Sequence, residues 1–166
     1  MANKKVKIRK VRDNAQIPQS KNGNWYDCYI SQVAKVPNIK LNWDLANKCA
    51  IDKGALVYNA GDVIVVYLGF ATDIGKGYEG HLISRSSTFT NYGLILTNCI
   101  GLIDDSYCGD NDEWRLPVLA VHDTKIEKGE RICQFRIIEH QPELEIEVVD
   151  SLDNADRGAF GSTGTK

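Results

Sequence analysis

Apolar and polar positions alternate in short runs along most of the chain. Runs of this length, bounded by polar turns, are typical of β-strands. We expect strands within residues 4–12, 55–72, 91–104, 115–123, 130–140 and 143–151. Many short strands with turn signals between them favour a β-sandwich or barrel over alternating strand–helix–strand units. The hydrophobic pattern therefore predicts an all-β fold.

Turn residues divide two of these segments. Asn59 to Asp62, with Gly61 as the conformationally permissive residue, predicts a turn between two strands. Thr97-Asn98 lies between two apolar runs and predicts the tip of a hairpin. We expect helical turns only within residues 40–50 and 87–93.

Composition changes only near the end of the chain. There is no internal repeat and no earlier boundary, so we expect one β domain over residues 1–150 and a flexible arm over 151–166. The arm is rich in glycine, which loses the most backbone freedom when it is ordered, and it contains one aromatic residue, Phe160. Phe160 is either a stray aromatic residue in a disordered tail or the lid of an arm that orders over a ligand.

Basic residues gather at the N-terminus, although the net charge of the 166-residue chain is only −2. Six of the 20 lysines and arginines lie within residues 4–12, which could indicate a nucleic-acid-binding arm. Val6 and Ile8, however, alternate there with basic residues, as in a half-buried strand whose outer face is basic. We therefore expect a strand and no nucleic-acid partner.

Cysteine and histidine positions say little about metal binding. Five cysteines include no C-x-x-C pair and three histidines are scattered, so we expect no structural zinc site. An odd cysteine count without a signal peptide indicates reduced thiols in the cytoplasm. No apolar run approaches the ~20 residues that a membrane span requires, so we expect a soluble protein without a membrane partner.

Five polar segments together resemble the five motifs of the trimeric dUTPases, including phage-encoded members of that family. They are YDCYIS (26–31), GHLISRSS (80–87), NCIGLIDDSYCG (98–109), GERICQF (129–135) and RGAFGSTG (157–164). Their order and nearly their spacing match over almost the whole chain, and the last three are specific as a set. The resemblance implies a distorted jelly-roll-like β-barrel or sandwich, a homotrimer with shared sites, and hydrolysis of dUTP to dUMP and pyrophosphate in the cytoplasm of the cell or of a phage host.

Asp27 matches the aspartate of the first motif. In the family this carboxylate reaches a magnesium ion through water while the ion holds the triphosphate. Such a role suits Mg²⁺, which keeps several waters and prefers hard oxygen ligands. Trp25 and Tyr26 precede Asp27 where the family usually has small residues.

Arg85 and Ser86 match the phosphate-binding arginine and serine of the second motif. A guanidinium pairs with phosphate through two hydrogen bonds, and a serine hydroxyl donates to a bridging oxygen. Ser84 and Ser87 replace the usual proline and glycine. These replacements make the second motif more similar to that of the related dCTP deaminases, which share the fold. That second enzyme class needs a glutamate on the strand after the third motif. Residues 114–121 contain no acid, and the nearest acids, Asp110, Asp112 and Glu113, precede them.

Asn98, Asp104 and Tyr107 lie in the third motif. The resemblance implies that Asn98 and nearby backbone amides match the edge of uracil and leave cytosine wrongly paired. It implies that Asp104 holds the 3′-hydroxyl and orients the attacking water, although a turn-capping role also fits its local sequence. Tyr107 would pack under the sugar and leave no room for a ribose 2′-hydroxyl.

The fourth and fifth motifs supply the remaining expected contacts. Gln134 would lie near the γ-phosphate. Arg157, Ser162 and Thr163 would hold the phosphates, with Phe160 stacked on the uracil. The usual R-G-x-G-G-F is shortened to R-G-A-F in this chain, which brings Arg157 closer to Phe160.

Residues 33–53 form a longer connection than is usual in the family. We expect that this insertion could bind a protein partner through an exposed Trp43, which would make the chain a nucleotide-gated regulator. Packing of Trp43 on the sheet is the alternative. The three functions considered are thus a dUTP diphosphatase, a dCTP deaminase-like enzyme and a protein-binding regulator.

Overall fold

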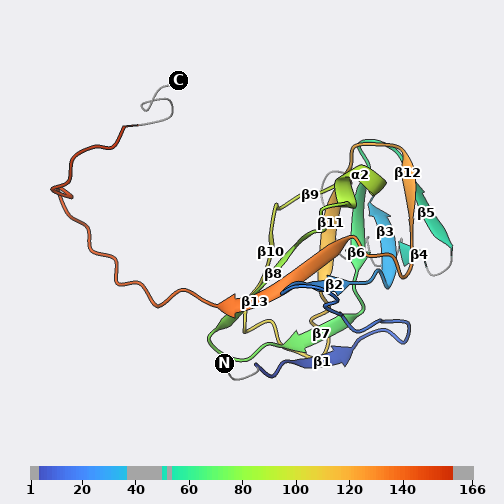
Figure 1. Cartoon of the computed structure of the whole chain (residues 1–166), viewed down its shortest axis with the longest axis horizontal. Helices are drawn as coiled ribbons and strands as arrows, with labels where there is room; N and C mark the ends of the chain where they lie inside the picture. The colour runs from blue at the N-terminus through green and yellow to red at the C-terminus, as the bar shows by residue number, and fades with distance from the viewer. Residues whose placement is uncertain (1–3, 37–49, 52–53, 159–166) are drawn as a thin grey trace.

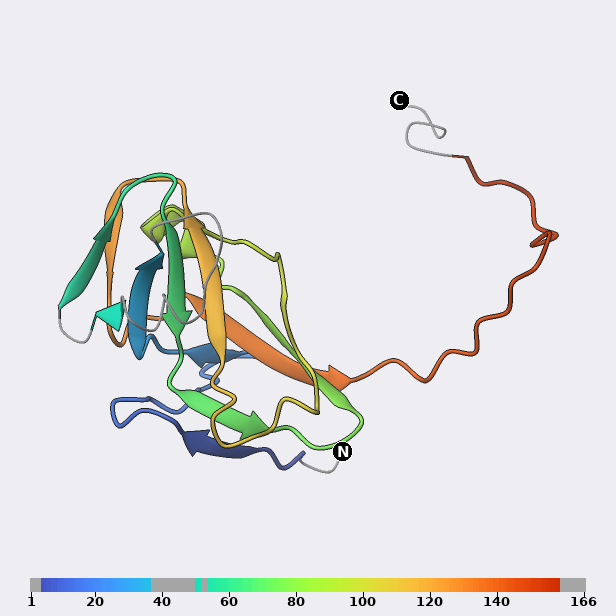
Figure 2. The same ribbon diagram turned by 180° about the vertical axis from the view of Figure 1, so that it is seen from behind.

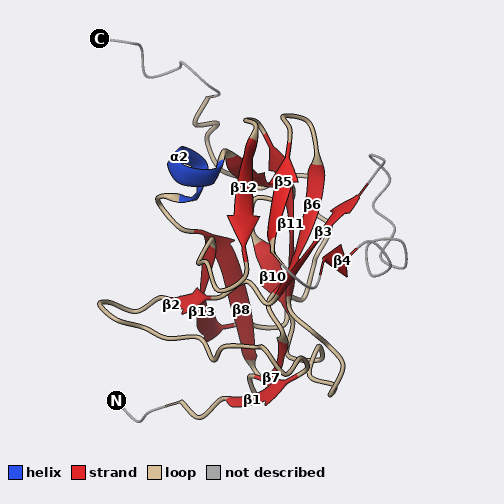
Figure 3. Ribbon diagram, turned by 90° about the vertical axis from the view of Figure 1, so that its right-hand side faces the viewer, coloured by secondary structure: helices blue, strands red, loops and turns tan. Residues whose placement is uncertain are grey.

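Two antiparallel sheets form the body of the molecule in this computed structural model, which describes residues 4–36, 50–51 and 54–158 (Figures 1 and 3). One sheet has the strand order β10-β8-β13-β2 and the other β4-β3-β6-β11-β9. The first sheet consists of β10 (Gly101–Ile103), β8 (Tyr78–Ser84), β13 (Cys133–Glu139) and β2 (Tyr26–Cys28). The second consists of β4 (Ala50–Ile51), β3 (Gln32–Val36), β6 (Val63–Tyr67), β11 (Arg115–Ala120) and β9 (Leu94–Leu96).

Two smaller strand pairs and one helix complete the part of the fold that the structure describes. β1 (Lys7–Lys10) pairs with β7 (Phe70–Asp73), and β5 (Ala55–Tyr58) pairs with β12 (Thr124–Glu127). The short helix α2 (Thr88–Tyr92) ends at Gly93, which has a left-handed backbone with a φ of 57°. No helix of the described residues is long and apolar enough to cross a membrane.

β6 is continuously apolar because both of its faces are covered. Ile64 and Val66 enter the main hydrophobic cluster, whereas Val65 and Tyr67 enter a second cluster on the opposite face. A strand that is buried on both sides needs apolar residues at every position instead of alternate ones. The uninterrupted run at 63–67 therefore marks the interior of the five-stranded sheet.

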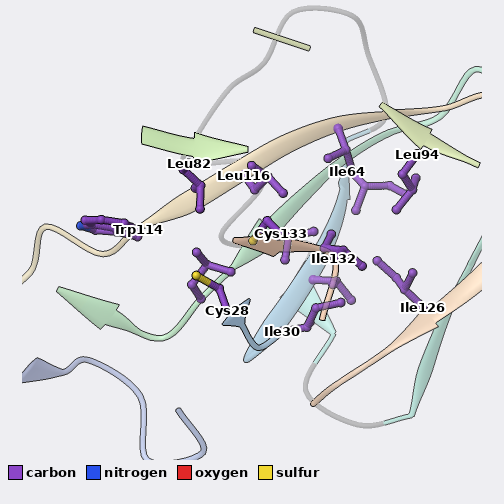
Figure 4. Packing of buried hydrophobic residues seen from close by; sticks show 14 of the residues in the cluster. Cys28, Ile30, Ile64, Leu82, Leu94, Trp114, Leu116, Ile126, Ile132 and Cys133 are labelled. Atoms are coloured by element: carbon purple, nitrogen blue, oxygen red, sulfur yellow. The ribbon is translucent and has the colours of Figure 1, made fainter. Parts of the chain in front are cut away.

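The main cluster lies between the two large sheets and joins them (Figure 4). Trp114 is fully buried, and its ring packs edge-on against Phe135 of β13 at 4.9 Å and beside Phe70 of β7 at 5.4 Å. Leu82 and Leu116 face the same cluster from β8 and β11. Trp114, which lies shortly after the third motif in the sequence, is thus anchored in the core.

Most of the sequence-based predictions of secondary structure are confirmed. The fold is all-β with one short helix, and strands occur in the predicted segments 4–12, 55–72, 115–123 and 130–140. The predicted turn at Asn59 to Asp62 is present, with a hydrogen bond of 3.0 Å from the Asp62 N–H to the Asn59 carbonyl. β5 and β6 on either side of it nevertheless belong to different sheets. The predicted helix at 87–93 is α2, whereas 40–50 lies outside the described residues except for Ala50.

The predicted hairpin at Thr97-Asn98 is wrong. β9 pairs with β11 and β10 pairs with β8, so the two apolar runs belong to different sheets. A left-handed Cys99 (φ 60°) and a tight hydrogen bond from the Ile100 N–H to the Asn98 carbonyl (2.6 Å) turn the chain between them. The local pattern resembled a hairpin because two short apolar runs flank the polar pair Thr97-Asn98.

The predicted strand at 143–151 is also wrong. β13 ends at Glu139, and residues 140–158 contain no strand or helix (Figures 1 and 2). Alternation alone does not form a strand, because a strand also needs a neighbour with which to exchange backbone hydrogen bonds. The boundary predicted at residue 150 stays a prediction.

Candidate active site

Strand register brings the first, second and fourth motifs together at one end of the four-stranded sheet. Asp27 on β2 lies opposite Gln134 on β13, and Gln134 lies opposite Ile83 on β8. Arg85 follows β8 directly, and its backbone N–H donates to the Ile132 carbonyl at 3.1 Å. Three segments that are distant in sequence are therefore fixed side by side by backbone pairing.

Asp27 is bound by two arginines. Nε of Arg85 donates to Oδ1 of Asp27 at 2.7 Å, and Nη1 of Arg131 donates to Oδ2 at 2.8 Å. The carboxylate is 16% exposed and both guanidinium groups are partly buried. One carboxylate between two guanidinium groups leaves an excess positive charge, which attracts an anion such as a phosphate.

Arg131 is a functional candidate that the sequence analysis missed. It belongs to the fourth motif segment, and its carbonyl also accepts a 3.3 Å hydrogen bond from Nη1 of Arg85. The available signal was only a cation within the fourth motif segment, three residues before Gln134. The amide of Gln134 makes only a long contact of 3.4 Å to the Ser84 carbonyl, and Ser86 is exposed.

The metal-binding capacity of this cluster is limited to one carboxylate. Among the described residues, no group of three or more histidine, cysteine, aspartate or glutamate side chains could hold a metal ion. Asp27 alone suits Mg²⁺, which proteins often bind through one or two carboxylates together with substrate phosphates. The donor set fits an ion that arrives with a triphosphate instead of one held in a complete protein cage.

The third motif forms one side of a separate cavity of ≈ 530 Å³. Asn98 and Tyr107 both line it, together with Glu113 and Trp114. The indole N–H of Trp114 is buried and has no acceptor among the described residues. Buried donors of this kind normally have a partner, and the described residues supply none for this one.

Asp104 begins the turn that follows β10. Its Oδ1 accepts the backbone N–H of Ser106 at 2.8 Å, and its carbonyl accepts the N–H of Tyr107 at 3.0 Å. The hydroxyl and the backbone N–H of Ser106 lower the pKa of Asp104 below its ordinary value of 3.8. The exposed carboxylate is therefore ionised at neutral pH and could accept a proton.

Tyr107 is held by a second residue that the sequence analysis did not assign to the site. Its hydroxyl donates to the backbone carbonyl of Glu113 at 3.2 Å, and burial raises its pKa, so the phenol stays protonated as a donor. The Glu113 side chain is 3% exposed and accepts two hydrogen bonds from Arg12, at 2.6 and 2.8 Å. Glu113 was noted only for the deaminase comparison, and sequence spacing does not predict its pairing with Arg12.

The predicted site residues thus form two groups. Asp27, Arg85 and Gln134 gather at the sheet end, and none of them lines the cavity that contains Asn98 and Tyr107. Arg157 is exposed within residues 140–158. Phe160, Ser162, Thr163 and Trp43 lie outside the described residues.

Comparison with known proteins identifies the family. The sequence model of the dUTPase family matches residues 53–165. The chain is 55% identical over 102 residues to the SPbeta prophage-derived deoxyuridine 5′-triphosphate nucleotidohydrolase YosS of Bacillus subtilis, covering 61% of this chain and 72% of YosS.

Solved phage dUTPases share the fold. A mutant dUTPase of Staphylococcus bacteriophage 80alpha with dUpNHpp matches with a TM-score of 0.72 and 19% identity over 98% of this chain and 99% of its own. A mutant dUTPase from phage phi11 of S. aureus, described as coordinating a structural Mg(II) ion, matches with a TM-score of 0.63 and 17% identity over 90% of this chain and 99% of its own. The family match and the arrangement of the motifs together show that this chain belongs to the dUTPase family and is a dUTP diphosphatase.

Proposed function

We propose that the chain hydrolyses dUTP at a site shared between the subunits of a homotrimer, by in-line attack of water on the α-phosphorus. The supporting observation is the division of the motif residues into a cationic cluster at the sheet end and a separate nucleoside-sized cavity. A single chain offers two half-sites, and a neighbouring copy would bring the second half to the first.

In the cavity half, Asn98 and nearby backbone groups bind the uracil edge and the ring of Tyr107 packs under the deoxyribose. Asp104 holds the 3′-hydroxyl, orients the water and accepts its proton. The lowered pKa of Asp104 keeps the carboxylate ionised at neutral pH, the form that accepts hydrogen bonds from the sugar hydroxyl and the water.

In the cluster half, Arg85 exchanges partners when the triphosphate binds. Its guanidinium leaves Asp27 for phosphate oxygens, while Arg131 keeps the carboxylate in place. Ser86 donates to a bridging oxygen and Gln134 lies near the γ-phosphate. Asp27 would help to hold Mg²⁺, and the ion would supply positive charge that neutralises the triphosphate.

The arm completes the site from a third direction. Arg157, Ser162 and Thr163 bind phosphate oxygens, and Phe160 stacks on the uracil. Stacking of an aromatic side chain on a base contributes ~1 to 3 kcal/mol. Ordering the arm costs ~1 to 2 kcal/mol of backbone entropy per residue, so closure also needs the contacts to the triphosphate.

Exposed apolar residues after β13 support the homotrimer. Leu144, Ile146 and Val148 alternate along the chain and are 60%, 83% and 94% exposed. Apolar residues at every second position are typical of one face of a strand, and burying that face here requires a second chain. Assembly would thereby supply the neighbour that the predicted strand at 143–151 lacks.

The alternatives receive less support from the structure. β11 carries no acid, and Glu113 just before it is committed to Arg12, so no carboxylate is placed for deamination. Residues 37–49 and 52–53 of the longer connection are outside the described residues, so the protein-binding role of residues 33–53 stays a prediction.

Two measurements test the proposal together. Pyrophosphate release from dUTP, dCTP, dTTP and UTP, with and without Mg²⁺, should show strong preference for dUTP and stimulation by the ion. Light scattering should give about 55 kDa, three times the 18.5 kDa chain. Full dUTP turnover by a monomer at micromolar concentration would contradict the shared site, and release from dCTP at an equal rate would contradict the uracil contacts.

A further inference from the structure

Glu113 is the only charged residue that is almost completely buried among those the structure describes. Besides the two hydrogen bonds from Arg12, its Oε1 accepts the backbone N–H of Gly69 at 2.9 Å. Burying a carboxylate is costly unless it is paired and hydrogen-bonded, and this one has three donors. A side chain held in this way has a fixed position.

The partner of Glu113 comes from the N-terminal segment. The guanidinium of Arg12 lies 4.6 Å above the ring of Tyr67 and also donates to Oε1 of Gln32. The backbone N–H of Arg12 donates to the Gly69 carbonyl at 3.2 Å, so Gly69 is bound by both members of the ion pair. Position 69 requires glycine, because its φ is 79° and a Cβ would lie 2.6 Å from Oγ of Ser31.

The peptide that follows Glu113 is equally fixed. The Trp114 N–H donates to the Phe70 carbonyl at 2.9 Å, and the Leu68 N–H donates to the Trp114 carbonyl at 3.0 Å. The Glu113 carbonyl, which accepts the Tyr107 hydroxyl, therefore lies between two anchored groups. The phenol of Tyr107 is the end of a rigid chain of contacts that starts at Arg12.

We propose that the buried Arg12–Glu113 ion pair positions Tyr107 and thereby sets the selectivity of the enzyme for deoxyribose over ribose. The inference rests on the proposed function, in which the ring of Tyr107 packs under the sugar. Exclusion of a 2′-hydroxyl by contact works only if the ring stays in place when the larger sugar presses on it. The Glu113 carboxylate is buried and is occupied by three donors, so Glu113 acts through Tyr107 and is a positioning residue.

The test compares kcat/KM for UTP with kcat/KM for dUTP in matched variants. Tyr107→Phe removes only the hydroxyl that reaches the Glu113 carbonyl, and we expect the UTP/dUTP ratio to rise about fivefold, as for the loss of one hydrogen bond. Glu113→Gln and Arg12→Lys disturb the buried pair itself, and we expect the same direction of change. Asp73→Asn breaks the exposed ion pair between Asp73 and Lys7 (2.8 Å) and serves as the control with an unchanged ratio.

The outcomes separate this inference from the proposed function. If Tyr107→Ala raises the ratio but Tyr107→Phe and Glu113→Gln leave it at the wild-type value, Tyr107 excludes ribose without help and the positioning role is wrong. If Tyr107→Ala also leaves it unchanged, the proposed role of Tyr107 fails first. Should Glu113→Gln fail to fold, which thermal unfolding would reveal, Arg12→Lys decides on the pair, because it keeps the charge but loses the two hydrogen bonds to Glu113. An unchanged ratio in a folded Arg12→Lys would contradict the positioning role.

Discussion

The two halves of the site are built by different means. The phosphate half, around Asp27 and Arg85, stands on three paired strands whose register fixes each side chain. The nucleoside half stands on the loop between β10 and β11, which has no strand register and depends on side-chain anchors such as Glu113. Strands position residues through backbone pairing alone, whereas a loop needs a buried contact for each residue that it must hold.

The charges of the two halves are also used differently. In the phosphate half, Asp27 and Arg85 form an ion pair in the free protein. We expect the more highly charged triphosphate to replace Asp27 as the partner of Arg85. In the nucleoside half, the buried carboxylate of Glu113 stays paired with Arg12 throughout. We therefore expect changes in the first half to alter affinity for the triphosphate and changes in the second to alter chemistry or selectivity.

The largest effect should come from the carboxylate of the nucleoside half. Asp104→Asn keeps the shape of the side chain but removes the base, so we expect kcat to fall by about 10²- to 10⁴-fold with dUTP affinity within about tenfold. Single-turnover kinetics and equilibrium binding measure the two quantities. Asp105→Asn is the matched control, because Asp105 instead accepts the Gly77 N–H at 2.7 Å. A tenth of wild-type kcat in Asp104→Asn would contradict the assignment.

Removal of the arm should have the next largest effect. Residues 151–158 are all exposed, so a chain ending at Asp150 should fold and assemble almost normally. It should lose at least about 90% of its activity, and Phe160→Ala should reproduce only the ~1 to 3 kcal/mol of base stacking. Activity, melting temperature and mass by light scattering are the measurements. Full activity in the truncated chain would make the arm dispensable.

Arg131→Met tests the phosphate half. Without Arg131, Asp27 has only Arg85 as a cationic partner, and the triphosphate must compete more strongly for that arginine. We expect KM for dUTP to rise roughly tenfold, the scale of one charged hydrogen bond, while the UTP/dUTP ratio of kcat/KM stays unchanged. Lys125→Met, which breaks an exposed ion pair with Glu127, should leave KM as it is. A change in sugar selectivity in Arg131→Met would mean that the two halves are not independent.

The sequence predicted the phosphate-binding residues better than it predicted the residues that hold the site in place. Asp27, Arg85 and Gln134 follow from motif order. Their meeting does not, because β2 and β8 lie outside the segments that the hydrophobic pattern predicted as strands. Arg131 was missed because a single arginine in a motif carries no sign of its partner until the register is known. Glu113 was missed for a stronger reason, since its partner Arg12 is 101 residues away and the local pattern around neither residue indicates the pairing.

The errors in the fold have a common physical origin. The runs at 91–96 and 100–104 have the local pattern of a hairpin, and 143–151 has that of a strand, yet pairing is decided by which edges are near. β9 and β10 each find a better neighbour in a different sheet, and residues 143–151 have none within the described part of the chain. Alternation predicts which residues can form a strand but not with which neighbour.

The smallest expected effect concerns the pH dependence of the nucleoside half. Asp104 acts as a base only when ionised, so activity is present above its pKa in the folded enzyme and is lost as pH falls through it. The Ser106 hydroxyl is the largest cause of the lowered pKa, so Ser106→Ala should move that pKa up toward 3.8, while the remaining backbone N–H keeps the change below about one pH unit. The acid limb of kcat/KM should shift to higher pH, with rates at pH 7 unchanged.

Ser151→Ala is the matched control, because it removes a similar hydroxyl contact to Asp153 and should leave the acid limb of kcat/KM in place. Carbon-13 NMR titration of the Asp104 carboxyl reads the pKa directly, and an identical titration in both proteins would show that Ser106 does not tune the base.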